Sequence, residues 1–386
     1  MSKKIKIAII DADLIGRDRH RFPNLACEKI SGYWKEKGAS VSLRLNYDNL
    51  DKYDEVYISK VFTDTPFPRG IKNKKNVHIG GTGFYFDKAP KLKKEIEHHF
   101  PDYHLYDKWI KREIENARRE AEKKEIYFDE NRFKAQFKEY TDYSIGFLTR
   151  GCFRKCKFCV NQKYNKVTKH SPLDEFYDPK RKKICLLDDN FFGCPYWKEM
   201  LQQLIDTGKQ FKFKQGLDER LLTDEKCEML FKCKYDGDIT FAFDNLSDYD
   251  LVHEKLKLIR KYTDAINIKF YVLAGFKSTD AKDIEGIFKR IELLFKYKCL
   301  PYVMRYQDKN YAPWKKSKYR ALYTTIARWA NQPSIVKKMS FRQFCKANQD
   351  RHKTTGTLSS SMNSMKKYEK KYPKIAKKYF DMRYED

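Results

Sequence analysis

Three closely spaced cysteines are the residues of this 386-residue chain that are best suited to chemistry. Cys152, Cys156 and Cys159 form a C-x-x-x-C-x-x-C pattern directly after an apolar run that ends at Gly151. Three thiolates on one short loop can bind three irons of a [4Fe–4S] cube and leave the fourth iron open to an outside ligand. A cluster that does chemistry on a bound molecule needs such an open iron. The pattern therefore indicates a catalytic iron–sulfur centre.

A structural zinc site is the alternative use of the same three thiols. Cys185, Cys194 or His170 could supply the fourth ligand of a tetrahedral zinc ion. Zinc modules are usually built from paired ligands, however, and the chain has no second C-x-x-C pair. The spacing favours the iron–sulfur interpretation and leaves zinc as the competing hypothesis.

The elements around the cysteines predict a sheet that could hold a bound molecule. From residue 144 on, six short apolar runs alternate with amphipathic helical stretches, which is typical of an α/β fold with a parallel sheet. Ligands bind at the carboxyl ends of such strands. The predicted strands are 144–149, 184–187, 211–214, 239–243, 268–273 and 302–304. Polar or glycine-containing segments follow five of them, namely 188–190, 215–220, 244–245, 274–276 and 305–306, and we expect the site there.

The cysteine motif followed by this strand pattern resembles the signature of the radical SAM superfamily. Phe158, just before the last cysteine, matches the aromatic residue of that signature. The resemblance implies a partial (β/α)6 barrel, a [4Fe–4S] cluster whose open iron chelates S-adenosylmethionine, and a low-potential electron donor of the flavodoxin or ferredoxin type. Reductive cleavage of S-adenosylmethionine would then yield a 5′-deoxyadenosyl radical, which abstracts hydrogen from a substrate. A methyl transfer or a rearrangement could follow.

The same resemblance implies cofactor-binding roles for the strand ends. Asp188, Asp189 and Asn190 stand where the family holds the amino group of S-adenosylmethionine, and because the family's glycines are missing, side chains are expected to make this contact. Gly275 lies in a segment similar to the one that packs against adenine. The remaining implied residues are Gln215, Asp218 and Arg220, near the ribose or the carboxylate, and Arg305 with Tyr306, for substrate or cofactor contacts.

The first hundred residues predict a separate Rossmann-like or flavodoxin-like unit, with strands at 5–10, 41–45, 55–59 and 77–79 and a helix at 24–37. Its layout resembles the cobalamin-binding domain that precedes many radical SAM barrels. That domain's D-x-H-x-x-G motif corresponds to residues 11–16, its S-x-L segment to 59–61 and its glycine pair to 80–81. Asp13 replaces the histidine that ligates cobalt, and a carboxylate is a poor substitute. A retained scaffold or a substrate-positioning domain is therefore favoured, and cobalamin binding stays open.

Length and patterning predict four segments. A cobalamin-binding-like domain spans 1–104, and the barrel spans 143–311. Between them, a charged helical linker at 105–142 should bridge the domains across solvent, because opposite charges fall at i,i+4 positions. A basic extension at 312–386, with helices at 319–331, 340–348 and 365–383, is expected to cover the open barrel edge and to end in a mobile or docking tail.

The net charge of +28 is the second strong feature of the chain. Lysines interleaved with aromatic residues suit phosphate contacts and base stacking, which indicates a nucleic acid or nucleotide substrate. A protein or small-molecule substrate stays open, because a compositional bias would enrich the same residues. The lack of any apolar run of about eighteen residues predicts no membrane span, and ten cysteines without a disulfide-like framework indicate a reducing cytoplasm. The alternative function is a non-catalytic nucleic-acid-binding protein stabilised by zinc or by a cluster.

Overall fold

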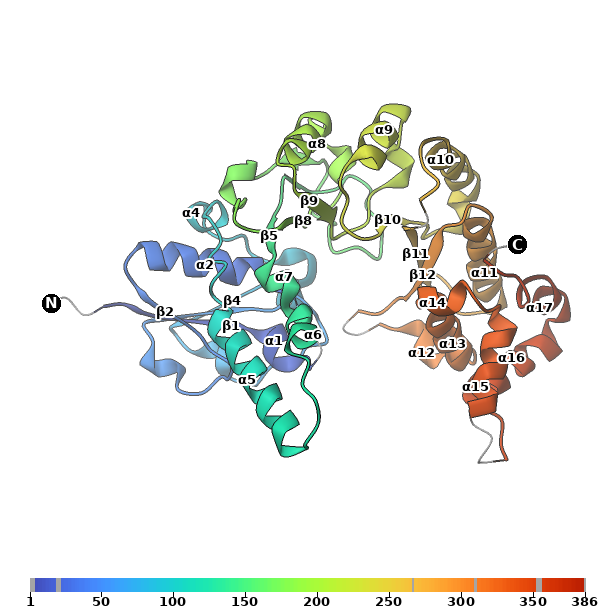
Figure 1. The fold of residues 1–386 in the computed structure, drawn as a ribbon, viewed down its shortest axis with the longest axis horizontal. Coiled ribbons are helices and arrows are strands. Elements are labelled where there is room, and N and C mark those ends of the chain that lie inside the picture. The colour runs from blue at the N-terminus through green and yellow to red at the C-terminus, as the bar shows by residue number, and fades with distance from the viewer. Residues whose placement is uncertain (1–3, 19–21, 266, 309–310, 352–355, 385–386) are drawn as a thin grey trace. The chain divides into compact units, whose positions relative to one another are not determined.

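The computed structural model describes residues 4–18, 22–265, 267–308, 311–351 and 356–384 (Figure 1). The chain has a mixed α/β fold with parallel sheets, which confirms the predicted class. It divides into two compact units. The first comprises Met1–Asp188 and Lys209–Phe211, and the second comprises Asp189–Gly208 and Lys212–Asp386. The four segments expected from the sequence stay a prediction.

The first unit holds a four-stranded sheet and the segment with the three cysteines. Its strands are β1 (Lys6–Asp11), β2 (Ser40–Leu43), β3 (Glu55–Ser59), β4 (Val77–Gly80), β5 (Tyr143–Gly146), β6 (Thr149–Arg150), β7 (Thr168–Lys169) and β8 (Lys183–Leu186). Its helices are α1 (Ala12–Gly16), α2 (Leu25–Glu36), α3 (Thr82–Tyr85), α4 (Lys94–Glu97), α5 (Asp107–Lys123), α6 (Glu130–Lys134) and α7 (Lys138–Thr141).

The second unit contains strands and helices in alternation, followed by helices alone. Its strands are β10 (Ile239–Ala242), β11 (Ile268–Ala274) and β12 (Leu300–Arg305), and the unit boundary passes through β9 (Gln210–Phe213). Its helices are α8 (Trp197–Asp206), α9 (Asp224–Lys232), α10 (Tyr249–Tyr262), α11 (Ala281–Lys296), α12 (Pro313–Lys316), α13 (Arg320–Ala330), α14 (Pro333–Val336), α15 (Phe341–Arg351), α16 (Ser360–Lys371) and α17 (Pro373–Tyr379).

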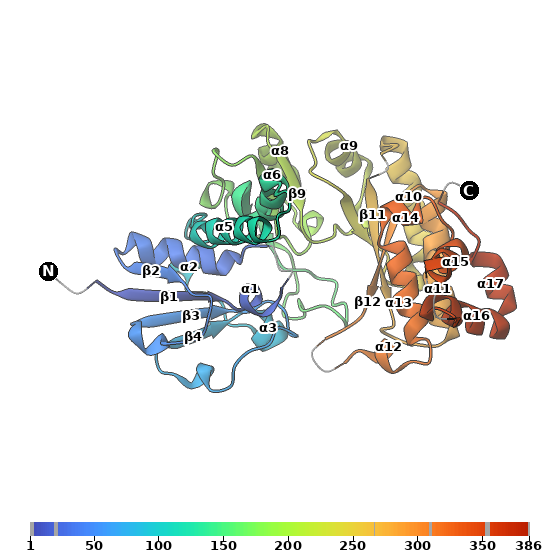
Figure 2. The same ribbon diagram turned by 60° about the horizontal axis from the view of Figure 1, so that its bottom comes forward.

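The four-stranded sheet has the order β2-β1-β3-β4, and its neighbouring strands are parallel. Alternate residues of β1 point to opposite faces, so Ile7 and Ile9 join one core, whereas Ala8 and Ile10 join the other. On the first face, α2 and α5 cover the sheet (Figure 2). The Asn24 side chain caps α2 by accepting the backbone N–H of Cys27 at 3.3 Å.

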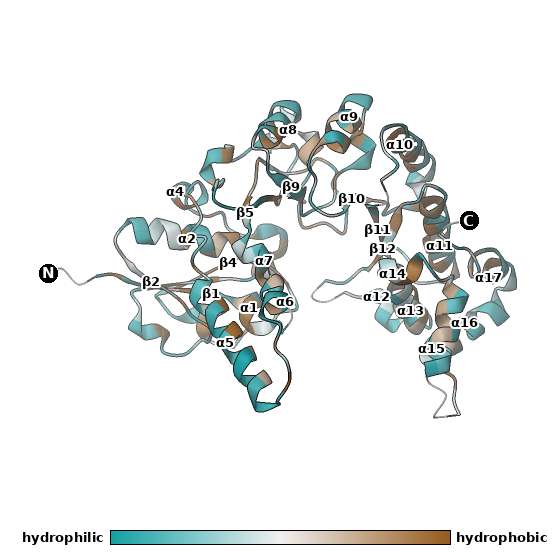
Figure 3. Ribbon diagram, in the orientation of Figure 1, coloured by the Kyte–Doolittle hydropathy of each residue, from teal (hydrophilic) through white to brown (hydrophobic). Residues whose placement is uncertain are grey.

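Helix α5 differs from the predicted solvent-spanning linker. Trp109 and Ile110, in its first turns, are buried in the same core as α2, so the helix starts as part of the first unit. Most of its later residues are exposed and charged, as its hydrophilic colouring shows (Figure 3). Tertiary packing of two apolar residues thus anchors a helix whose average composition is strongly polar.

The six strands predicted after residue 143 are confirmed as β5, β8, β9, β10, β11 and β12, but they are distributed between two sheets. One sheet has the order β5-β8-β9 and the other has the order β10-β11-β12. Strand β9 ends at Phe213, and the following segment reaches β10 through one parallel bridge, between Leu217 and Phe241. Because a single bridge does not make a ladder, the described strands do not form one continuous sheet.

The C-terminal helices pack into the second unit, which contradicts the expected mobile or docking tail. Phe380, after α17, is fully buried. The centroid of its ring lies 5.3 Å from that of Phe288 in α11 and 5.1 Å from that of Phe341 in α15. The single helix predicted at 365–383 is broken at Pro373, which begins α17, because proline has no N–H to continue a helix. None of the described helices is long and apolar enough to cross a membrane.

Candidate active site

A short antiparallel hairpin forms the neck of the cysteine loop. Thr149 pairs with Lys169 and Arg150 pairs with Thr168, in β6 and β7, which the sequence did not predict. The pairing continues outward, since the N–H of His170 donates to the Leu148 carbonyl at 2.8 Å. The two ends of the loop that carries Cys152, Cys156 and Cys159 are therefore held together.

Gly151 is required where the chain leaves the neck. Its φ is +98°, and a Cβ at this position would lie 2.4 Å from the Lys166 carbonyl oxygen. Inside the loop, the N–H of Cys159 donates to the Cys156 carbonyl at 2.9 Å, and the Gln162 side-chain amide donates to the Cys159 carbonyl at 3.1 Å. The glycine lets the backbone pass close to the returning chain at Lys166, and Gln162 ties the segment of the last two cysteines together.

Asp188 holds the neck to the end of β8. Its Oδ1 accepts the backbone N–H of Thr149 at 2.6 Å and the Thr149 hydroxyl at 2.7 Å, while Oδ2 accepts the Leu148 N–H at 3.2 Å. The carboxylate is 2% exposed. Asp188, which the resemblance assigned to S-adenosylmethionine, therefore has a clear positioning role for the chain that enters the cysteine loop.

The sulfurs of Cys152 and Cys159 accept hydrogen bonds from the backbone of their own loop. Backbone N–H groups of Arg154 and Asn161 donate to the sulfurs of Cys152 and Cys159, each at 3.4 Å, and such donors stabilise negative charge on sulfur. All three cysteines and Phe158 are half-buried. Nowhere among the described residues are three His, Cys, Asp or Glu side chains gathered as a metal-binding group. The donor set suits an iron–sulfur cluster in its chemistry, although the structure does not assemble the three sulfurs as ligands.

The fourth ligands considered for zinc have other roles. Cys185 in β8 and Cys194 are buried in the core. His170 pairs with Glu97 through Nε2 and Oε1 at 3.2 Å, and its ring stacks on His98 with the centroids 5.2 Å apart. Although burial raises the pKa of Glu97, the hydrogen bond with His170 and the charge of Lys29 hold that pKa below its ordinary value. The imidazole is thus paired with a carboxylate.

Three of the predicted cofactor-binding residues meet in the second unit. The Asn190 amide donates to Asp218 Oδ2 at 3.3 Å, and the Arg220 Nε donates to Asp218 Oδ1 at 2.6 Å. Glu219 belongs to the same group, because its Oε1 lies 3.8 Å from Arg220 Nε and its Oε2 accepts the N–H of Ala242 at 3.3 Å. Burial, followed by the charge of Asp218, raises the pKa of Glu219 to about 8. Asp218 and Glu219 are buried, whereas Arg220 is half-buried, so its guanidinium is the charge of this cluster that a ligand could reach.

Gly275 and Arg305 meet at a second place in this unit, around Trp314. Gly275 has a φ of +67°, and a Cβ there would lie 2.8 Å from the Cβ of Trp314. The Arg305 guanidinium lies 4.4 Å from the centroid of the Trp314 ring and donates to the Thr324 hydroxyl at 3.1 Å. Tyr306 donates to Asp308 at 2.9 Å. Trp314 is buried, so its side chain fills the space beside Gly275 and packs against the Arg305 cation.

Two predicted residues lie apart from these groups. Gln215 is exposed and makes none of the hydrogen bonds of the Asp218 cluster, and Asp189 is half-buried between Asp188 and Asn190.

Sequence reasoning missed Arg290, which binds the strand ends together. Its guanidinium donates to the carbonyls of Phe243 and Asp244 after β10 and of Leu273 in β11, at 2.9 to 3.0 Å. Its position on the apolar face of α11, between Ile287 and Leu294, was the available signal.

In the first unit, Asp13 is bound by its own chain. Its carboxylate accepts the N–H groups of Val61 at 2.6 Å and Phe62 at 3.4 Å, and also the hydroxyl of Thr65. The neighbouring loops pack closely, because a Cβ on Gly81 would lie 2.2 Å from the Lys60 carbonyl oxygen. The residue at the cobalt-ligand position thus fastens the loop after β3 to the end of β1, and it does not fit a role as a cobalt ligand.

The buried Asp11 carboxyl group, at the end of β1, should make the stability of the folded protein depend on pH. Burial is the main cause that raises its pKa to about 7, and the carboxyl group is fully buried against the Tyr106 hydroxyl at 2.9 Å. Because the folded state holds a proton that the unfolded state releases near pH 4, stability falls as pH rises from about 4 to about 7. Asn at this position keeps the cap of α1 and removes the titration.

We therefore expect Asp11→Asn to gain stability relative to the wild type by about 2–3 kcal/mol on going from about pH 5 to about pH 8. Urea unfolding, followed by tryptophan fluorescence at both pH values, measures this difference. Asp174→Asn, at an exposed site of the same unit, serves as the control. An equal pH dependence in the wild type and in Asp11→Asn would contradict the prediction.

No protein-family model matches this chain, and no curated protein is significantly similar to it.

Proposed function

We propose that the chain is a radical SAM enzyme, and the observation that carries the proposal is the cysteine loop at the end of β5. The C-x-x-x-C-x-x-C motif lies on a loop whose neck is closed by β6 and β7 and attached to the end of β8 through Asp188. Two of the three sulfurs accept backbone N–H groups. A loop held in this way could place three thiolates on a [4Fe–4S] cluster and leave one iron open.

The finer fold supports the same proposal. The order β2-β1-β3-β4 of the first sheet is the beginning of the flavodoxin-like order, in which ligands bind at the carboxyl edge. Parallel pairing within β5-β8 and β10-β11-β12, with α10 and α11 between the strands of the second sheet, agrees with a partial barrel. We propose a flavodoxin-like unit followed by a radical SAM barrel.

The strand ends of the second unit would bind S-adenosylmethionine. Arg220, which is only half-buried, offers a guanidinium for the carboxylate of the methionine part, and Asp218, oriented by Asn190, holds that guanidinium in place. The backbone at Gly275, whose φ is +67°, would pack against the adenine. When bound, the cluster would supply the electron that cleaves the C–S bond, while the chain positions the cofactor and shields the radical from water. A flavodoxin or ferredoxin is the proposed electron donor, and a nucleic acid or nucleotide is the proposed substrate.

We propose no cobalamin chemistry for this chain. Both oxygens of Asp13 accept hydrogen bonds from the loop after β3, so its carboxylate is committed to holding the chain. The first unit would then act as a scaffold or as a substrate-positioning domain. The transferred group or rearranged bond would have to come from S-adenosylmethionine or from the substrate itself.

The test is anaerobic. After reconstitution with iron and sulfide, the wild type is given dithionite and S-adenosylmethionine, and 5′-deoxyadenosine and iron content are measured beside Cys156→Ala. Cys233→Ala is the matched control, because its half-buried thiol lies outside the loop. We expect product from the wild type and from Cys233→Ala, and background levels from Cys156→Ala. No product from the wild type, with zinc bound in place of iron, would overturn the proposal and favour a zinc-stabilised nucleic-acid-binding protein.

A further inference from the structure

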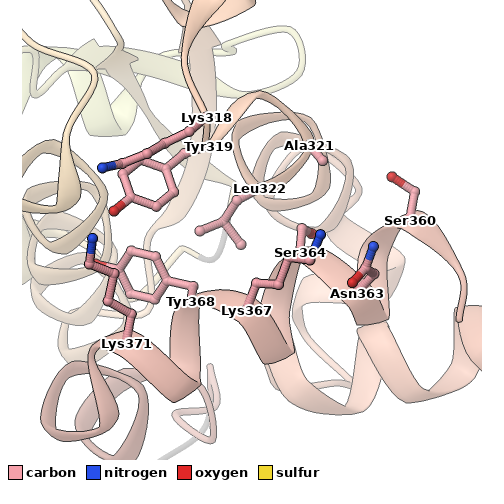
Figure 4. Close-up of a pocket in the computed structure, with 10 residues that line it drawn as sticks. All are labelled: Lys318, Tyr319, Ala321, Leu322, Ser360, Asn363, Ser364, Lys367, Tyr368 and Lys371. Atoms are coloured by element: carbon pink, nitrogen blue, oxygen red, sulfur yellow. The ribbon is translucent and has the colours of Figure 1, made fainter.

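A cavity lined by lysines lies in the second unit, between the beginning of α13 and the length of α16 (Figure 4). It has a volume of about 310 Å³, which is at the lower end of the range for small-molecule pockets. Lysines, tyrosines and small polar residues predominate in its lining, and no carboxylate is present. The lining residues that matter here are Lys318, Tyr319, Asn363, Lys367, Tyr368 and Lys371.

The positive charges around this cavity have no acidic partner within it. Lys367 and Lys371 are one turn apart on α16, and two like charges at this spacing repel each other and destabilise a helix. The single carboxylate of α16, Glu369, pairs instead with Arg342 at 2.8 Å. Asp280 and Glu285, whose charges act on Tyr368, do not line the cavity. The arrangement therefore favours binding of an anion.

Two lysines from different elements converge on one pair of phenols. The Tyr319 hydroxyl donates to the Tyr372 hydroxyl at 3.1 Å, and the Lys318 ammonium lies 5.3 Å from the centroid of the Tyr319 ring. The hydrogen bond with Tyr319, followed by the charges of Lys371 and Lys318, lowers the pKa of Tyr372. In Figure 4 both ammonium groups lie on the side of the Tyr319 hydroxyl. Charge from the turn before α13 and charge from α16 are thus concentrated at one end of the cavity.

We propose that this cavity binds a phosphate group of a single-stranded nucleic acid. The lysines neutralise the phosphate, and the tyrosines form an aromatic wall beside it. A single strand is favoured over a duplex, because the ligand must enter a concave site of about the size of one nucleotide. This inference rests on the proposed function, because it names the substrate class of the proposed enzyme. Binding of the nucleic acid itself requires no iron–sulfur cluster.

The test compares two lysine pairs on the same helix. Lys367→Gln/Lys371→Gln changes the cavity, whereas Lys366→Gln/Lys370→Gln changes two exposed lysines with the same spacing outside it. Fluorescence anisotropy with a labelled 12-nucleotide single-stranded RNA, and with the same sequence as DNA, is followed over a salt titration. For the cavity variant we expect the Kd to rise about tenfold and the salt slope to fall by about 0.7, which is the contribution of one lost phosphate contact on a single strand. The control pair should change the Kd less than about twofold.

Every other outcome would overturn the inference. Equal weakening by both pairs would mean diffuse attraction by the +28 charge, and no binding by the wild type would mean that no such site exists. Tighter binding of a polyglutamate peptide, with the same dependence on Lys367 and Lys371, would assign the cavity to an acidic protein. Cys156→Ala should bind the RNA as the wild type does, because it does not change the cavity. Cys156→Ala therefore tests the radical chemistry, and Lys367→Gln/Lys371→Gln tests the binding site.

Discussion

Asp188→Ala is expected to lower the free energy of unfolding of the first unit by about 3–5 kcal/mol. The carboxylate is buried and accepts three hydrogen bonds, two from backbone N–H groups and one from the Thr149 hydroxyl. Alanine leaves these three donors without an acceptor in a place that water does not reach, and each such donor costs about 1–3 kcal/mol. Because the donors lie at the neck of the cysteine loop, we also expect the variant to retain less iron after reconstitution.

Urea denaturation and iron analysis measure the two effects of Asp188→Ala. Asp174→Ala, at an exposed carboxylate of the same unit, should change the free energy of unfolding by less than about 0.5 kcal/mol. Asp188→Asn keeps one acceptor oxygen, but its amide NH2 group, which is a donor, would face the N–H and O–H donors of the neck. We therefore expect an intermediate loss in the free energy of unfolding. Wild-type stability in Asp188→Ala would show that the carboxylate does not hold the neck.

Arg290→Met is expected to destabilise the second unit by a similar amount, about 3–5 kcal/mol. The guanidinium is 3% exposed and donates to the carbonyls of Phe243, Asp244 and Leu273, and also to that of Gly286 in its own helix. Methionine fills a similar volume but leaves those oxygens without their donor. Arg290→Lys should rescue little, because one ammonium group cannot reproduce the planar fork.

The loss of Arg290 should also change the titration of Asp244. Burial is the main cause that raises the pKa of Asp244 to about 6, and the charge of Arg290 opposes this effect. In Arg290→Met the pKa should therefore rise further, so the free energy of unfolding should fall more steeply with rising pH than in the wild type. Lys282→Met, at an exposed position of α11, is the control for both measurements. A pH profile parallel to that of the wild type would contradict this expectation.

The strands could be placed from the sequence because their apolar runs are local signals. The run at 55–59 coincides with β3, and the run at 268–273 lies within β11. The neck formed by β6 and β7 could not be found in this way, because two-residue strands leave no periodicity to detect. The division of six strands between two sheets depends on pairing between distant segments, which apolar runs do not specify. The break at Pro373, by contrast, was visible in the sequence.

The candidate site could be predicted by residue type but not by role. Asn190, Asp218 and Arg220 were expected at strand ends and do form one hydrogen-bonded group. Asp188 was expected to face a ligand, yet its carboxylate is buried and accepts hydrogen bonds from its own chain, as does that of Asp13 at the position of the cobalt ligand. Whether a carboxylate faces a ligand or the backbone depends on tertiary burial, which one sequence does not disclose. Arg290 was hidden for the opposite reason, because charged residues on helices are usually solvated.

The closed neck of the cysteine loop has an entropic consequence. Joining the ends of a flexible loop of about 17 residues, the length between Arg150 and Thr168, costs about 2.5 kcal/mol relative to an open chain. The fold meets this cost through β6, β7 and Asp188 before any metal arrives. A cluster would then need to order only the interior of the loop, so its retention should depend less on the affinity of each thiolate than it would in an unrestrained peptide of the same sequence.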